Sequence, residues 1–199
     1  AQDADATVRI FTPAMELPFA GHPTLGTAHV VNRTAGRGGK LTLAMKAGRI
    51  PVSLAGDTWT LTAGAPRDRD VAVADVEALA HALGLSTTDV AGPVRWVNTG
   101  MEQLLVPLGS VDAVRRATPA PELARYRNEF GKVGVYVFSP LTEADMTVRF
   151  FFGKGPQGLA EDPATGSACA NLGGYALLAG VAPLRRTLAQ GEQVGRKSR

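Results

Sequence analysis

The chain has 199 residues, of which 45% are hydrophobic and 20% are charged, and its formal net charge is +3. This balance is typical of a protein that folds around a core, and it excludes a disordered or fibrous chain. The length allows either one large domain or two small ones. Basic residues gather at 185–186 and 196–199, without interleaved aromatic side chains, so no nucleic-acid partner is predicted.

Cysteine and histidine are too few and too scattered for a disulfide scaffold or a structural metal site. Cys169 is the single cysteine, and the three histidines at 22, 29 and 81 lack ligand spacing. No apolar run approaches the roughly 18 residues that a membrane-spanning helix needs, and the polar N-terminus does not resemble a signal peptide. The sequence therefore predicts a cytoplasmic protein with no metal and no membrane partner.

Alternating apolar and polar residues predict a chain rich in strands with few helices. Strands are expected at 7–11, 40–45, 49–54, 58–62, 94–97, 103–107, 133–138 and 146–152. Short helices are expected at 76–83, closed by Gly84, and at 111–116. Longer helices are expected to begin near Pro23 and Pro163.

An internal repeat relates the two ends of the chain. Residues 21–28 (GHPTLGTA) recur at 161–168 (EDPATGSA), and at the same offset of 140 residues the strand residues 9–11 fall on 149–151. We therefore expect two similar halves, each with a strand, a proline-containing loop and a helix.

Loop residues near position 68 divide the halves. The expected domains are an N-terminal half-domain, 1–68, which lacks its first strands, and a C-terminal domain, 69–199, which lacks its last strands. This incompleteness is inferred from the uneven amount of sequence before and after the two copies of the repeat.

Proline suits the first turn of a helix, where its missing N–H has no helical partner. Pro23 and Pro163 are therefore expected at the first helical position, with His22 and Asp162 as the two N-caps. Residues 164–180 are nearly all small or apolar, which predicts a central helix buried on all sides, with Cys169 packed inside.

The two helix starts form the candidate site. Each would offer unpaired N–H groups and the positive end of a helix dipole, so together they could bind a small carboxylate. Thr165, Gly166 and Ser167 would add hydroxyl donors and a backbone that a ligand can approach closely. His22 and Asp162 are candidate acid and base groups, which predicts proton transfer at carbon. The alternative for each is a helix cap without catalytic function.

Residues 153–158 (GKGPQG) fit the G-x-G-x-x-G pattern of a dinucleotide-binding loop. Such a site also needs a helix that begins in the loop and an acidic residue about 20 positions later. Here Pro156 stands in the loop and residue 178 is leucine. No cofactor is therefore predicted.

Three segments resemble the phenazine biosynthesis PhzF-like family: 9–13 (RIFTP), 16–28 (ELPFAGHPTLGTA) and 161–168 (EDPATGSA). Residues 190–196 look like the third motif of that family. The resemblance implies an α+β, diaminopimelate-epimerase-like fold with two pseudo-symmetric domains, each a curled mixed sheet around a central buried helix. It also implies a homodimer and a cofactor-independent isomerase that shifts a proton on a small carboxylic acid in an interdomain cleft.

The resemblance makes His22 and Asp162 catalytic and gives Gly21, Gly166 and Ser167 to substrate binding. The acid/base glutamate of the family lies upstream of the first motif, in a stretch like NLSETTF, and no residue of this chain matches it. Two alternatives therefore stay open. One is a truncated, non-catalytic homologue that binds small anions, and the other is an amino-acid epimerase or racemase, which would need a second base.

Overall fold

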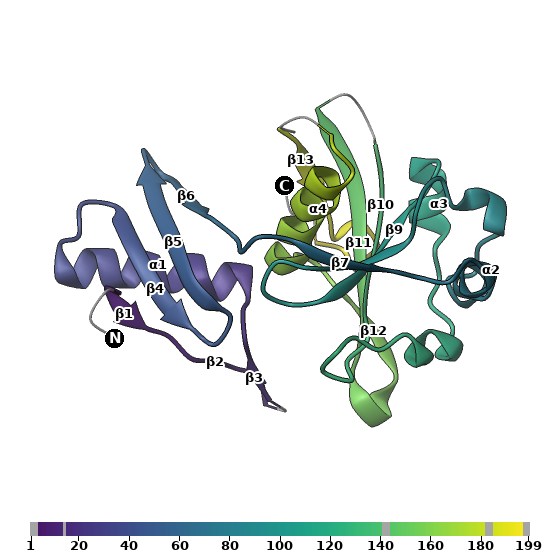
Figure 1. Cartoon of the computed structure of the whole chain (residues 1–199), viewed down its shortest axis with the longest axis horizontal. Coiled ribbons are helices and arrows are strands. Elements are labelled where there is room, and N and C mark those ends of the chain that lie inside the picture. Colours follow the sequence, from purple (N-terminus) through teal and green to yellow (C-terminus); the bar gives the residue numbers. More distant parts are fainter. Residues whose placement is uncertain (1–3, 14, 141–143, 182–184, 197–199) are drawn as a thin grey trace. The chain divides into compact units, whose positions relative to one another are not determined.

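The computed structural model describes residues 4–13, 15–140, 144–181 and 185–196 (Figure 1). The chain forms two compact units. The first holds the chain up to Ala65 together with Thr99–Met101 and Thr165–Ala170, and the second holds the remainder. The predicted boundary at residue 68 falls just inside the second unit. Of the predicted basic cluster at 196–199, only Arg196 is among the described residues.

A four-stranded mixed sheet and one long helix make up most of the first unit (Figure 1). The strand order is β1-β4-β5-β6, with β1 parallel to β4 and the other pairs antiparallel. These elements are β1 (Ala6–Thr7), β4 (Lys40–Met45), β5 (Gly48–Ala55), β6 (Thr58–Leu61) and α1 (Gly21–Ala35). Alternate residues of β4 and β5, including Leu43 and Ile50, are buried in one core with Ala28 of α1. This alternation is what a sheet covered by a helix on one face requires.

The second unit is built on a seven-stranded mixed sheet, ordered β12-β11-β10-β9-β8-β7, with β13 paired to β11. Its strands are β7 (Arg67–Asp70), β8 (Arg95–Asn98), β9 (Gln103–Pro107), β10 (Gly134–Pro140), β11 (Asp145–Gly153), β12 (Leu159–Asp162) and β13 (Thr187–Ala189). Its helices are α2 (Val73–Ala82), α3 (Val111–Arg116) and most of α4 (Gly166–Leu178).

Both faces of this sheet are covered, so nearly every residue of β10 and β11 is buried. On one face, Val135 and Val137 join a core with side chains of α2 and α3. On the other face, the ring of Phe138 lies 5.5 Å from that of Tyr175 in α4.

Most predicted elements are confirmed. The predicted strands at 40–45 and 103–107 and the helix at 111–116 have the same bounds in the structure, as β4, β9 and α3. The other predicted strands differ by one or two residues at an end, except that 7–11 is divided into β1 and β2 (Ile10–Phe11). No helix in the described part of the chain is long and apolar enough to cross a membrane.

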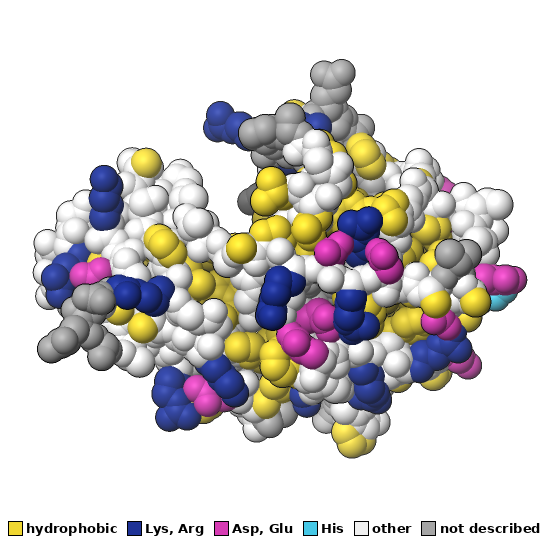
Figure 2. Space-filling model, viewed as in Figure 1, with side chains coloured by type: hydrophobic (Ala, Val, Ile, Leu, Met, Phe, Trp, Pro, Cys, Tyr) yellow, Lys and Arg dark blue, Asp and Glu magenta, His cyan; other side chains and the backbone are white. Residues whose placement is uncertain are grey.

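The strand β7, with the sequence RDRD, was not predicted, because a strand with all four residues exposed carries no apolar alternation. Its charges pair with neighbours in the same unit. Arg95 of β8 lies 2.8 Å from Asp68, and Arg69 lies 2.9 Å from Glu102. Figure 2 shows the resulting mixture of positive and negative side chains over the region of β7. Such charges protect an edge strand from pairing with other chains.

Helix α4 is not buried on all sides, contrary to the prediction. Cys169, Gly173 and Leu177, spaced four residues apart, are exposed, while Leu172 and Ala176 are buried. A run of small and apolar residues has no periodicity that could reveal the open side. Surrounding atoms still desolvate the thiol of Cys169 and raise its pKa, so it stays protonated at neutral pH and is a weak nucleophile.

The prediction that His22 and Asp162 are N-caps is wrong. His22 is the second residue of α1, whose cap position is Ala20. Asp162 is the last residue of β12, four residues before α4 begins. Pro23 can lie deeper in the first turn because N–H groups there have no helical acceptor. Asp162 remains extended because it pairs with Phe150 in the antiparallel ladder.

Two matching ion pairs show how the repeat aligns. Arg9 donates to Glu16 through Nε at 2.9 Å and Nη2 at 3.1 Å. Arg149 donates to Glu161 through the same two nitrogens, at 3.0 Å and 2.7 Å. The arginines are 140 residues apart and the glutamates 145, because the loop between arginine and glutamate is five residues longer in the second half.

From these glutamates onward the halves align at an offset of 145 residues. Gly21 then corresponds to Gly166, the first residues of α1 and α4, and His22 corresponds to Ser167. The predicted correspondence of His22 with Asp162 is therefore incorrect, although both halves do carry the same arrangement of strand, loop and helix.

Candidate functional site

The starts of α1 and α4 touch at a pair of glycines, both in the first unit. A Cβ atom on Gly21 would lie 2.7 Å from the Cα of Gly166 and 2.9 Å from its carbonyl carbon. A Cβ atom on Gly166 would lie 3.0 Å from the Cα of Gly21. This approach leaves no room for a side chain at residue 21, so the contact requires glycine at the start of α1. At residue 166, the start of α4, it leaves very little space for a Cβ atom.

Both helix starts present backbone N–H groups. The first helical bonds run from Thr24 N–H to Ala20 at 3.1 Å and from Cys169 N–H to Thr165 at 3.0 Å. N–H groups upstream of these bonds have no helical acceptor, and Ala20 provides no capping side chain. With 15 and 13 residues, the helices each contribute the positive end of a dipole at this point. The pair of starts therefore favours a bound carboxylate.

Four of the five predicted site residues lie together here. The backbone N of Ser167 would be 3.3 Å from a Cβ on Gly21, and the N of His22 would be 3.6 Å from a Cβ on Gly166. His22 is exposed and Ser167 is half-buried. An imidazole and a hydroxyl thus occupy equivalent positions, each one residue beyond the glycine contact, and their roles stay predictions.

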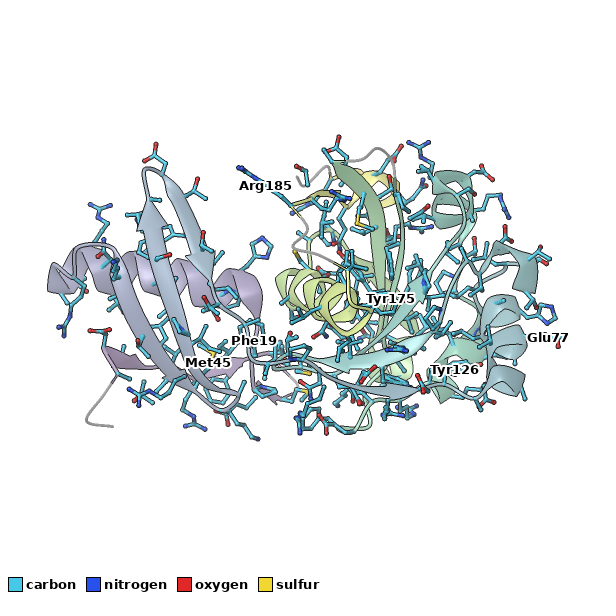
Figure 3. All side chains as sticks on the ribbon, turned by 45° about the horizontal axis from the view of Figure 1, so that its top comes forward. Phe19, Met45, Glu77, Tyr126, Tyr175 and Arg185 are labelled. Carbon is cyan, nitrogen blue, oxygen red and sulfur yellow. The ribbon has the colours of Figure 1, made fainter. Side chains whose placement is uncertain are left out.

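Buried side chains that were not predicted hold the start of α1. Phe19 is 1% exposed, and its ring lies against Gly100, where a Cβ would be 3.2 Å away. The fully buried Thr24 donates its hydroxyl to the Ala20 carbonyl at 2.7 Å and contacts the sulfur of Met45 at 3.9 Å. Figure 3 shows Phe19 and Met45 beside each other near this end of the helix. The sequence signal for Phe19 alone was the apolar Pro-Phe-Ala just before Gly21.

Asp162, the fifth predicted residue, belongs to the second unit. It is half-buried, and its carbonyl oxygen accepts a hydrogen bond of 2.8 Å from Nε2 of the buried Gln190. Gly191 follows with φ +87°, and a Cβ there would lie 2.8 Å from the carbonyl oxygen of Pro163 and closer still to that of Arg196. The third sequence motif therefore positions the Asp162 backbone, a role that its sequence alone did not predict.

Replacing Gln190 with alanine is expected to lower the free energy of unfolding by about 1–2 kcal/mol, because the partly buried hydrogen bond from its side chain to the Asp162 carbonyl is lost. Urea denaturation of the variant against Gln193→Ala, an exposed glutamine nearby, measures the effect. Equal stability of the two variants would contradict a positioning role for Gln190.

The two glutamates near the helix starts are engaged in structure. The Arg9 guanidinium lowers the pKa of Glu16 by hydrogen bonding, so this carboxylate is ionised at neutral pH. Glu161 is buried against Arg149, with 9% and 10% of their side chains exposed. Both glutamates are held in ion pairs with arginines, and His22 and Asp162 stay the predicted acid and base groups.

The chain matches a family model described as phenazine biosynthesis-like protein over residues 1–199. It is 37% identical to an uncharacterized isomerase of Pasteurella multocida over 194 residues, which covers 96% of this chain and 65% of the relative. It is 31% identical to a trans-2,3-dihydro-3-hydroxyanthranilate isomerase of Pseudomonas fluorescens, covering 98% of this chain and 68% of that protein.

A solved structure supports the same relationship. The PhzF-family phenazine biosynthesis protein of Bacillus anthracis superimposes with a TM-score of 0.78 at 25% identity, covering all of this chain and 71% of that one. The predicted α+β, diaminopimelate-epimerase-like fold class is thereby confirmed. The chain spans about two thirds of the length of these relatives. It belongs to the phenazine biosynthesis-like protein family, of the PhzF type.

Proposed function

We propose that the protein is a cofactor-independent isomerase that moves a proton between carbons of a small, unsaturated carboxylic acid. The observation that carries this proposal is the glycine contact between two helix starts, which offers a carboxylate two sets of backbone N–H groups. The names of the relatives, isomerases of unstated or dihydro-hydroxyanthranilate substrates, support the same reaction class.

In this proposal Gly21, Gly166 and Ser167 bind the carboxylate of the substrate. Fixing that group orients the adjacent carbon and draws electron density toward the carboxylate as the proton leaves. His22, one residue into α1, assists the transfer, because an imidazole gains and loses protons near neutral pH. Asp162 is the second proposed acid/base group, and the predicted cleft between the two halves stays a prediction.

The proposal is tested with the full-length gene product that contains this sequence. The protein is incubated in deuterated water with trans-2,3-dihydro-3-hydroxyanthranilate, the substrate named for a relative, and with simpler unsaturated acids. We expect solvent deuterium at carbon in at least one acid. Calorimetric binding of these acids without any deuterium uptake would overturn the isomerase and favour the non-catalytic, anion-binding alternative.

His22→Ala is expected to slow deuterium uptake by about 10²–10⁴-fold, the usual contribution of a positioned acid/base group. His29→Ala is the matched control, since His29 is exposed on the same helix and its ring lies 6.4 Å from that of Trp59. An equal loss of activity in both variants would contradict the proposed role of His22 in proton transfer.

The proposal extends to a cytoplasmic homodimer that acts in phenazine biosynthesis or a related pathway. Sedimentation analysis of the full-length product would show a single species of twice the monomer mass, and a monomer at micromolar concentration would contradict the dimer.

A further inference from the structure

The glycine-rich loop at 153–158 borders a pocket that plays no part in the proposed reaction. The pocket has a volume of about 410 Å³ and lies wholly within the second unit. This volume falls within the range of small-molecule sites, roughly 300–1,000 Å³. None of the residues that line it belongs to the candidate site at the helix starts.

The pocket combines apolar walls with a positive rim. Its walls include Val133, Leu159 and Ala124, which belong to or pack against the main core of the second unit. The charged residues that line it are Arg127 and Lys132, and no lining residue is acidic. Arg127 donates Nη1 to the carbonyl oxygen of Gly131 at 2.9 Å, which holds its guanidinium at the rim, and Lys132 is exposed.

Three glycines, Gly153, Gly155 and Gly158, form one side of the pocket. Gly155 and Gly158 have φ values of +65° and +83°, which side chains rarely adopt, so the loop keeps an open backbone surface there. Between them the chain makes one short 3₁₀ turn, Gly155–Gln157. This turn is too short to provide a helix dipole for a pyrophosphate, so the loop is not a dinucleotide site.

We propose that this pocket binds a small amphipathic carboxylate, with the carboxylate at Arg127 and Lys132 and an apolar chain or ring against Val133 and Leu159. A cationic rim without acidic groups selects an anion. The apolar walls then distinguish a carboxylate that carries hydrocarbon from a compact, fully hydrated anion such as phosphate, because only the former removes apolar surface from water.

Amide NMR of the 199-residue chain, titrated with hexanoate, tests the proposal. We expect saturable shifts of the amide signals of Gly153, Gly155 and Gly158, with a dissociation constant on the order of millimolar, as is usual for a ligand of this size. Hexylammonium and inorganic phosphate are the comparison ligands. Equal shifts with either one would overturn the proposal, because the pocket would then lack charge selection or an apolar contribution.

The amides of Gly21 and Gly166 report separately on the helix starts. Hexanoate shifts confined to these two residues would place binding at the proposed reaction site and overturn the second pocket without affecting the proposed function. Shifts at the loop glycines support the pocket whatever the outcome of the isomerase assay.

Lys132→Gln should weaken hexanoate binding about two- to fivefold, the usual size of an exposed ionic contact. Lys154→Gln is the matched control, because it removes the same charge from the glycine-rich loop at a residue that does not itself line the pocket. Equal weakening of hexanoate binding in both variants would show that only the net charge of the protein matters. It would overturn the proposal that Lys132 contacts the carboxylate.

Discussion

Replacing Arg149 with methionine is expected to lower the free energy of unfolding by about 3–5 kcal/mol, enough to unfold many domains of this size. The substitution leaves the Glu161 carboxylate buried without its partner. It also removes Nη1, whose two N–H groups are shared among the carbonyl oxygens of Val114, Arg115 and Ala117, at 3.0, 3.1 and 2.6 Å, at the C-terminal end of α3. Methionine fills a similar volume but supplies none of these donors.

The repeat provides an internal control for this prediction. Arg9 makes the same two-nitrogen contact with Glu16, and each guanidinium lies 4.8 Å from the ring of the phenylalanine two residues later. The Arg9 pair is exposed, with 66% of the Arg9 side chain open to solvent, so Arg9→Met should leave stability almost unchanged. Urea denaturation of both variants gives the comparison. Similar losses of stability in the two variants would mean that burial and the bonds to the α3 carbonyls contribute nothing to the stabilising effect of the Arg149–Glu161 pair.

These paired motifs also show what the sequence could and could not provide. The repeat was detectable because Arg9 and Arg149 are the same residue and because residues 21–28 resemble residues 161–168 in type. The correct alignment of the two copies could not be detected, because an ungapped offset hides a hairpin loop that is five residues longer in the second half. Only the contacts of the two arginines with their glutamates fix where the offset changes.

The candidate site was predicted in part for the same reason. Gly21, His22, Gly166 and Ser167 were identified from glycine, proline and hydroxyl residues at helix starts, and such signals are local. The contribution of Gln190 depends on a bond to Asp162 across 28 residues, and that of Phe19 depends on packing against Gly100. Such long-range contacts leave no periodicity in a single sequence. For the same reason a helix of small residues such as α4 did not reveal its exposed side.

Replacing Gly21 with alanine is expected to separate the two helix starts and abolish the proposed carboxylate site. The new Cβ would stand 2.7 Å from the Cα of Gly166, which is backbone and cannot turn aside as a flexible side chain would. The helices must then shift apart, at a cost of about 1–3 kcal/mol in stability. A shift of this kind also misplaces the N–H groups that would hold the substrate, so deuterium uptake in the full-length product should fall by about 10²-fold.

Gly26→Ala distinguishes this steric effect from a general effect of alanine in α1. Gly26 lies in the same helix and is exposed, and a Cβ there would have no atom within 4 Å apart from the backbone of its own helical turns. Alanine there should stabilise the protein by up to about 1 kcal/mol, because glycine is the poorer helix former, and should leave activity unchanged. Gly166→Ala, with its Cβ 3.0 Å from the Cα of Gly21, should fall between the two in stability. Parallel gains in stability for Gly21→Ala and Gly26→Ala would show that the helix starts do not need the glycine contact, and the carboxylate site would lose its structural basis.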